Sequence, residues 1–112
     1  MIPKPIGPYR VSVTAGGFLF LSGQIAPDLS TVSEQTRQIM QQIQAVLKEA
    51  GLELNHVVKA TIFLKSMDDF QAVNQVYGEF FQRDPPARSA VEVSRLPKDA
   101  LVEIECVACL SP

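Results

Sequence analysis

The sequence is poor in the residue types that build metal, redox and nucleic-acid sites. It has one histidine, His56, and two cysteines, Cys106 and Cys109, in 112 residues. A structural zinc site takes about four nitrogen or sulfur ligands, so these three residues are too few and we expect no metal. The net charge of −2 leaves no excess of lysine and arginine for binding nucleic acid or an anionic membrane.

Long apolar runs are also lacking. A membrane-spanning helix needs about 18 continuous apolar residues, and no segment reaches that length. Residues 1–8 contain three prolines and no apolar stretch of the kind found in signal peptides. We therefore expect a cytoplasmic protein with no membrane partner, and the length fits one domain over residues 1–112.

Common catalytic signatures are missing. There is no G-x-S-x-G elbow, no Walker loop and no dinucleotide-binding fingerprint. Cys106 and Cys109 form a C-x-x-C, which can be a redox pair or half a zinc site. The odd spacing in a β-prone run puts them on opposite faces of a strand, which favours two small apolar residues. His56 follows Asn55 at a strand start, where an exposed, non-catalytic role is expected.

The first half of the chain predicts a hairpin followed by a helix. Two β-prone runs, 11–15 and 18–22, flank Gly16-Gly17, which is a hairpin signal. Apolar residues then recur with helical period over 32–50. Thr31 and Glu34 have capping-box spacing at its start, and Gly51 follows its end. The opposite side of this helix is expected to be solvated; its residues are Gln35, Gln38, Gln41, Gln42 and Lys48.

The second half predicts a strand, a helix and two further strands. The strand covers 57–65 and the helix 69–82, with Ser66 or Asp68 as its cap. Prolines 85 and 86 end the helix. The last strands cover 88–93 and 101–110. The order β-β-α-β-α-β-β predicts an α+β fold, with one mixed sheet and two helices packed on one face.

Both faces of this sheet carry apolar side chains. In the strand over 57–65, one face is predicted to hold Val58, Ala60, Ile62 and Leu64, and the other Val57, Thr61 and Phe63. Two helices can cover only one face. The second face needs a partner, and another copy of the chain is the simplest candidate.

One C-terminal stretch has residues suited to binding a carboxylate. Arg88 follows two prolines, and a firmly held guanidinium suits bidentate recognition of a carboxylate. Glu103 and Glu105 lie on the strand face away from Ile104, where a carboxylate can orient a water molecule. From the residues alone, a cross-strand ion pair between Arg88 and a glutamate is the favoured interpretation.

Several motifs follow one another along almost the whole chain. They are Ile6-Gly7-Pro8-Tyr9, G-G-F-L-F-L-S-G-Q-I over 16–25, Pro86-Ala87-Arg88-Ser89 with Val91-Glu92-Val93, Leu96-Pro97-Lys98-Asp99, and Ile104-Glu105. In this order, and above all in the P-A-R-S block followed by L-P-K, the chain resembles the RidA (YjgF) family.

The resemblance implies a fold, an assembly and an activity. The fold is α+β and chorismate-mutase-like, and three chains pack as a homotrimer whose sheets line a central barrel. The activity is hydrolytic deamination of reactive 2-imino acids, such as 2-iminopropanoate and 2-iminobutanoate, to 2-keto acids and ammonia. These imines leak from pyridoxal-phosphate dehydratases and damage other such enzymes. The resemblance implies no cofactor and no metal.

The same resemblance implies roles for individual residues. Arg88 matches the arginine that grips the substrate carboxylate, and Glu103 matches the glutamate that positions or activates the attacking water. Tyr9 and Ser22 match residues that line the pocket, and main-chain groups near Ala90 complete it. Because the pocket lies between subunits, Arg88 and Tyr9 can come from different chains.

The sequence departs from the family pattern at three places. Ala90 stands where many bacterial members have cysteine, which argues against thiol chemistry at this site. Arg10-Val11-Ser12 replaces the usual S-Q-A beside Tyr9. A turn and a short strand that are usual in the family are missing between Asp28 and Glu34, which can widen the pocket mouth or change a subunit contact.

Two other functions compete with the deaminase. A non-catalytic, carboxylate-binding regulatory trimer can use the same scaffold, since fold does not fix function. Retention of Glu103 beside Arg88 favours the enzyme, because a carboxylate receptor needs only the arginine. A protein that acts on RNA is disfavoured by the acidic composition and by the lack of a basic strip with aromatic residues.

Overall fold

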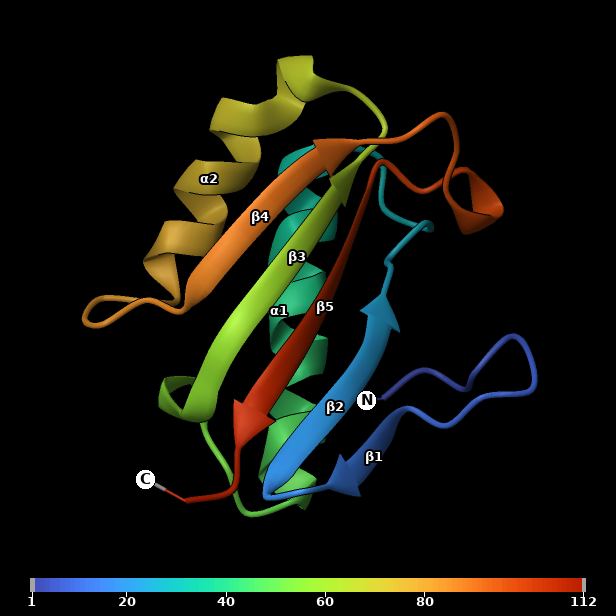
Figure 1. The fold of residues 1–112 in the computed structure, drawn as a ribbon. Coiled ribbons are helices and arrows are strands. Elements are labelled where there is room, and N and C mark those ends of the chain that lie inside the picture. Colours follow the sequence, from blue (N-terminus) through green and yellow to red (C-terminus); the bar gives the residue numbers. More distant parts are fainter. Residues whose placement is uncertain (1, 112) are drawn as a thin grey trace.

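The computed structural model describes residues 2–111, in which five strands form one mixed sheet and two helices cover one of its faces (Figure 1). The elements are β1 (Ser12–Ala15), β2 (Phe18–Gln24), α1 (Val32–Glu49), β3 (Val57–Leu64), α2 (Phe70–Glu79), β4 (Ala87–Glu92) and β5 (Val102–Cys109). This confirms the predicted β-β-α-β-α-β-β order. Within the described residues, no helix is long and apolar enough to cross a membrane.

The strands lie in the order β1-β2-β5-β3-β4. β3 and β4 are parallel and are connected through α2, whereas the other neighbouring strands are antiparallel. β5, the last strand of the chain, therefore lies in the middle of the sheet, between β2 and β3. β1 and β4 are the two edge strands (Figure 1).

The predicted hairpin and first helix are confirmed with their local signals. Gly16 and Gly17 have φ values of 58° and 84°, and two successive positive φ angles are typical of a type I′ hairpin turn. The Thr31 hydroxyl accepts from the Glu34 N–H, and the Glu34 carboxylate accepts from the Thr31 N–H, which completes the capping box. Gly51 has φ 75°, in the left-handed region that favours glycine.

The second helix is shorter than predicted. A 3-10 turn over Met67–Asp69 precedes it, and the helix ends at Glu79. The Ser66 hydroxyl accepts from the Asp68 N–H at 3.2 Å, so Ser66 caps the 3-10 turn. This local hydrogen bond holds the chain in a tighter turn before the α-helix begins.

The solvated side predicted for the first helix is partly wrong. Gln35 and Gln42 are only 2% and 3% exposed. The Gln35 side chain donates to the Leu29 carbonyl at 2.8 Å and accepts from the Leu101 N–H at 3.0 Å. The Gln42 side chain donates to Gln24 Oε1 at the end of β2 and to the Ile25 carbonyl. Burial of a polar side chain is tolerated when such partners are present.

The predicted alternation of β3 is also wrong at its first two residues. Val57 is 5% exposed and faces the core, whereas Val58 is 43% exposed. The pairing of β3 with β5 shifts between Val57 and Lys59. A β-bulge adds one residue to a strand and reverses the faces on either side of it. From Ala60 to Leu64 the predicted alternation holds.

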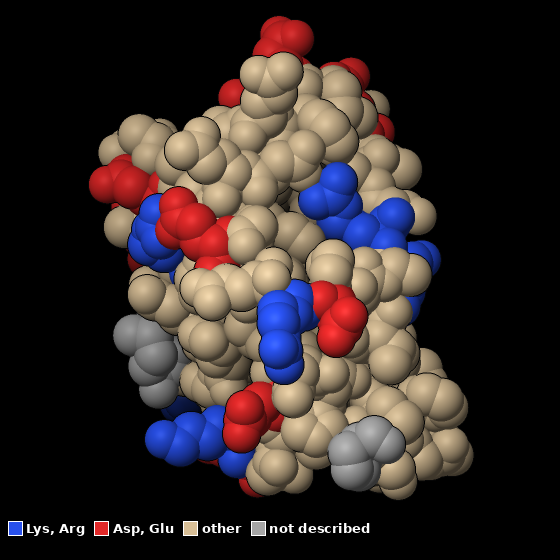
Figure 2. Space-filling model, turned by 90° about the vertical axis from the view of Figure 1, so that its left-hand side faces the viewer, with Lys and Arg blue, Asp and Glu red and all other residues tan. Residues whose placement is uncertain are grey.

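The sheet face away from the helices carries exposed apolar side chains. They are Val13, Phe18, Phe20, Val58 and Val91. We call this the open face. On the side of the molecule that carries α2 and β4, charged groups of both signs are scattered among uncharged residues (Figure 2). On the open face, the apolar side chains lie in the same sheet surface as the charged residues Lys59, Glu103 and Glu105.

Candidate functional site

Arg88 is held on the helix side of the edge strand β4. It pairs with Ala60, a core residue of β3, so its side chain turns toward α2. Its Nη1 atom donates to Asn74 Oδ1 at 2.6 Å. Its guanidinium carbon lies 5.6 Å from the centre of the Phe70 ring and 5.2 Å from that of Tyr77. Cation–π contacts at these distances are favourable, so the guanidinium has a defined position.

Tyr77 forms the buried part of this support. It is 5% exposed, and its hydroxyl has no hydrogen-bond partner within the described residues. Burial, followed by the nearby Cys106, raises the pKa of Tyr77 to about 12, while Arg88 acts in the opposite direction. The phenol is therefore neutral at physiological pH, and its ring supplies an apolar surface for the cation.

The three residues around Arg88 were missed as functional residues by the sequence analysis. Phe70, Asn74 and Tyr77 all belong to the second helix, for which the sequence predicted no functional role. Positions 70, 74 and 77 follow an i, i+4, i+7 spacing and so share one helix face. An asparagine on an otherwise apolar face was the available signal.

Glu103 lies on the open face of β5, opposite Phe63. It is half-buried and makes no hydrogen bond or ion pair with any residue in 2–111. Burial, and then the charge of Glu105, raises the pKa of Glu103 above its usual range. A carboxyl with a raised pKa and no structural partner is typical of a functional position.

Gly23 makes room for this carboxyl. A Cβ atom at position 23 would overlap Glu103 Oε2 and lie 2.8 Å from its Cδ. The backbone at position 23 therefore lies close to the Glu103 carboxyl, and a side chain at this position would displace that carboxyl. Ser22 and Gly23 also lie where the pairing of β2 with β5 shifts, between Leu21 and Gln24. β-Bulges of this kind are frequent beside active sites.

Ser22 anchors the N-terminal segment to the sheet. Its hydroxyl donates to the Arg10 carbonyl at 2.7 Å, and its N–H donates to the Val11 carbonyl at 2.8 Å. Ser22, which was predicted to line the pocket, thus holds the N-terminal segment in place. Its hydroxyl oxygen can still accept a hydrogen bond from a ligand.

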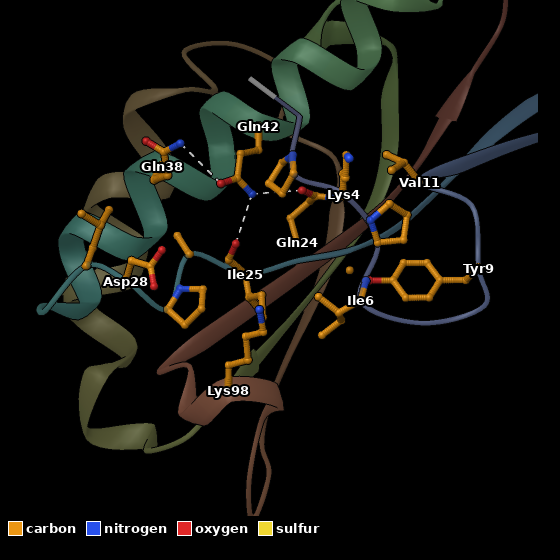
Figure 3. Close-up of a pocket in the computed structure, with 16 residues that line it drawn as sticks. Lys4, Ile6, Tyr9, Val11, Gln24, Ile25, Asp28, Gln38, Gln42 and Lys98 are labelled. Carbon is orange, nitrogen blue, oxygen red and sulfur yellow. Dashed lines mark hydrogen bonds between the residues drawn. The ribbon is translucent and has the colours of Figure 1, made fainter.

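Tyr9 is 45% exposed, and its hydroxyl accepts from the Ile6 N–H at 3.3 Å. It borders a cavity of about 350 Å³ between the N-terminal segment and the connection that follows β2 (Figure 3). The residues lining this cavity include Tyr9 and Gly23, but not Ser22, Arg88, Ala90 or Glu103.

The predicted site residues do not converge within one protomer. Ala90 is half-buried on the same side of β4 as Arg88 and packs against the core. Glu103 lies on the opposite face of the sheet. The cross-strand ion pair between Arg88 and a glutamate, which the residues alone favoured, is wrong: it is absent from the described residues, where Arg88 bonds Asn74 instead.

The cysteines have the arrangement predicted for strand residues. Cys106 is 4% exposed and faces the core, while Cys109 is half-buried on the other face, and both thiols are free. Burial, with a smaller contribution from Glu105, raises the pKa of Cys106 to about 12, so this thiol is protonated. Across residues 2–111, no three His, Cys, Asp or Glu side chains cluster in a way that could hold a metal ion.

Comparisons with known proteins agree over nearly the whole chain. Residues 1–110 match the model of the family described as Endoribonuclease L-PSP. A RutC family protein of Pyrococcus horikoshii is 52% identical over 113 residues, which cover 95% of this chain and 90% of that protein.

Solved structures give the same result. RidA from an Antarctic Psychrobacter has a TM-score of 0.92 at 33% identity, and covers 96% of this chain and 93% of its own. Escherichia coli TdcF with bound serine has a TM-score of 0.91 at 38% identity, with 96% and 92% covered. Sequence and structure together thus identify this chain as a member of the YjgF/RidA/RutC (Endoribonuclease L-PSP) family.

Proposed function

We propose that the protein hydrolyses 2-imino acids, such as 2-iminopropanoate and 2-iminobutanoate, to 2-keto acids and ammonia, as a homotrimer with sites between subunits. One observation carries the proposal. Glu103 is a half-buried carboxyl with a raised pKa and no partner in residues 2–111, packed against Gly23. Partial burial of a carboxyl without a partner lowers the stability of the fold. Groups with such perturbed pKa values cluster at functional sites.

Arg88 is suited to hold the substrate carboxylate. A guanidinium has five N–H donors, and Asn74 accepts from one nitrogen, Nη1. The remaining donors can form a bidentate pair with a carboxylate. Because Asn74 and the rings of Phe70 and Tyr77 already fix the guanidinium, little conformational entropy is lost when the substrate binds.

Glu103 is suited to move the proton. A water molecule attacks the carbon of the protonated imine, and Glu103 takes one proton from that water, which leaves a neutral carbinolamine with one hydroxyl and one amino group. Glu103 returns this proton to the amino group, the C–N bond breaks as the hydroxyl oxygen forms the C=O bond, and ammonia leaves. Glu103 takes the remaining hydroxyl proton and releases it to solvent. A carboxyl with a raised pKa is a better proton acceptor and donor near neutral pH, and holding the reactants together lowers the barrier further.

The placement of the two groups supports a site between subunits. Arg88 faces α2 on one side of the sheet, and Glu103 lies on the open face on the other side. One small substrate can touch both only if they belong to different chains. The exposed apolar side chains of the open face give those chains a surface to bury.

The first test is a coupled assay in which a threonine dehydratase generates the imine and 2-keto-acid formation is followed. We expect Arg88→Met and Glu103→Gln to abolish most of the acceleration. The matched controls Arg95→Met and Glu49→Gln, which change exposed residues of the same types, should retain it. No acceleration by the folded wild type would contradict the deaminase.

Mixing the two inactive variants tests the shared site. If each site takes Arg88 from one chain and Glu103 from its neighbour, random trimers of the two variants regain about a quarter of the wild-type sites. If both residues came from the same chain, no mixed trimer would be active. Refolding the variants together and then assaying them separates the two arrangements.

A non-catalytic carboxylate-binding trimer is the second candidate, favoured by one observation: the relative TdcF has been seen with bound serine. On this function Arg88 binds a carboxylate and Glu103 does no chemistry. Carboxylate binding that is lost in Arg88→Met, together with no acceleration in the coupled assay, would decide for the receptor.

A further inference from the structure

The cavity bordered by Tyr9 is enclosed by parts of the chain that lie far apart in sequence. Residues 3–6 form one wall, residues 25–29 a second, and Lys98, from the connection between β4 and β5, closes a third side (Figure 3). Its volume of about 350 Å³ falls in the range of about 300–1,000 Å³ usual for small-molecule pockets.

A chain of hydrogen-bonded glutamine amides, called here the relay, runs from Gln38 through Gln42 to Gln24 and ends at this cavity. Gln38 donates to Gln42 Oε1 at 3.4 Å, and Gln42 Nε2 donates to Gln24 Oε1 at 3.0 Å and to the Ile25 carbonyl at 3.2 Å. Because a carbonyl can only accept, the bond to Ile25 fixes the orientation of the Gln42 amide and, through it, that of Gln24. The NH₂ group of Gln24 is therefore the end of the relay.

This NH₂ group has no acceptor in residues 2–111, although Gln24 is only 6% exposed and lines the cavity. The nitrogen is reached by solvent within the cavity, because Tyr77 Oη is the one buried side-chain nitrogen or oxygen without a partner in residues 2–111. An acceptor atom of a ligand can take the place of that solvent.

The charges around the cavity favour an anion. Lys4 and Lys98 line it, and neither ammonium group has a hydrogen bond or ion pair with the part of the chain that the structure describes. Asp28 is the one carboxylate among the described lining residues. Figure 3 shows Lys4 and Lys98 reaching the cavity from different walls, with Asp28 at one end. Apolar groups such as Pro3, Ile6 and Pro27 line the remainder.

From these observations we infer a second ligand site, in which the Gln24 amide and the ammonium groups of Lys4 and Lys98 bind a small organic carboxylate. The ligand lies against the apolar residues through a short carbon chain. Asp28 is placed to accept from an ammonium group if the ligand is an amino acid. This site shares no polar side chain with the pair Arg88 and Glu103.

The test uses NMR of ¹⁵N-labelled full-length protein, with pyruvate and L-alanine as probes and sodium chloride at matched ionic strength as the blank. We expect saturable shifts of the Gln24 and Gln42 side-chain amides. The double variant Lys4→Met/Lys98→Met should weaken binding about tenfold or more, because two attractive charges are lost. Lys48→Met, an exposed lysine on α1 outside the cavity, should leave the affinity unchanged.

The two probes identify the class of ligand. Pyruvate carries a keto group on the carbon beside the carboxylate, where L-alanine carries an ammonium group. Asp28→Asn should weaken binding of L-alanine and leave pyruvate unaffected if the amino acid is the ligand. If pyruvate binds more tightly than L-alanine and Asp28→Asn does not weaken its binding, the site is assigned to keto acids. Both outcomes support a carboxylate site.

Arg88→Met separates this inference from the proposed function, because it removes the other carboxylate receptor and leaves the cavity intact. Amide shifts that persist in Arg88→Met support the second site, even if the wild type proves to have no deaminase activity. Shifts that are absent in the wild type, that disappear in Arg88→Met, or that respond equally to the Lys4/Lys98 and Lys48 changes would overturn it. Gln24→Glu, which keeps the acceptor for Gln42, should abolish binding of both probes.

Discussion

The two faces of the sheet are made of similar side chains and have opposite surroundings. On the helix side, Ile62, Leu64 and Ile104 are at most 1% exposed. On the open face, Phe18 and Phe20 are 39% and 45% exposed, although they come from the same sheet. The open face also carries Glu103, whose carboxyl has no partner within residues 2–111.

The helix-side face is stabilised by contacts within one chain. The open face carries apolar side chains that the two helices do not cover. The helix-side residues gain their free energy from burial by α1 and α2. The open-face residues gain little until another surface covers them. Changes on the two faces should therefore affect different measurements.

The largest effect is expected from Ile104→Ala. Removing a fully buried side chain leaves a cavity, so the free energy of unfolding should fall by about 2–5 kcal/mol. Val107→Ala, on the open face of the same strand and only half-buried, should cost less at protein concentrations where the chain is monomeric. Denaturant unfolding of both variants measures the difference, and equal losses would contradict the comparison.

The next effect concerns assembly. Phe18→Thr together with Phe20→Thr should dissociate the proposed trimer and leave the far-ultraviolet circular dichroism unchanged, because threonine keeps the strand propensity and removes the apolar surface. Sedimentation velocity gives the oligomeric state. Met67→Thr, an exposed apolar residue outside the sheet, is the control. A trimer that survives the Phe18/Phe20 change would show that the open face is not its interface.

A smaller effect is expected on the pH dependence. Glu105 contributes to the raised pKa of Glu103 after burial, so Glu105→Gln should move the rising limb of the pH–rate profile to lower pH. The raised pKa also means that the native state binds this proton more tightly than the unfolded state. Stability from this group is present at low pH and is lost as pH rises through the pKa of Glu103.

Glu105→Gln should reduce that loss of stability. The pH–rate profile and the unfolding free energy at several pH values measure the two consequences independently. A pH–rate profile that does not move in Glu105→Gln would show that Glu103 does not control the rate.

The smallest change in stability is expected for Gly23→Ala. The added Cβ meets the flexible end of Glu103, which can swing away at low energetic cost, so folding should be little affected while activity falls. Gly78→Ala, where a Cβ meets nothing within 4 Å, should raise helix stability by up to about 1 kcal/mol and leave activity unchanged. If Gly23→Ala retains full activity, the position of the Glu103 carboxyl is unimportant.

The elements of the fold could be predicted because their signals are local. The two glycines at 16–17, the Thr31–Glu34 capping box and the prolines at 85–86 act through the backbone within a few residues. Hydrophobic periodicity then gave the helix and strand types. The bulges at Val57–Lys59 and Leu21–Gln24 were not predictable, because a register shift depends on the neighbouring strand.

The sequence proposed residues for the candidate site but not their arrangement in space. Arg88, Glu103, Tyr9, Ser22 and Ala90 were selected from the residues and from the family resemblance. Their separation onto two faces of the sheet depends on the order of the strands, which places β5 between β2 and β3. Asn74 became relevant only when α2 packed beside β4 and brought it to 2.6 Å from Arg88.

By itself, the sequence determined which segments are helix or strand, that both sheet faces are apolar, and which motifs the chain shares with its family. These properties depend on residues close together in the chain, or on composition. Only the tertiary structure decided which polar groups find partners and which do not. The buried amides of Gln24 and Gln42, and the isolated carboxyl of Glu103, owe their surroundings to segments distant in sequence, because hydrogen bonding and desolvation depend on distance in space.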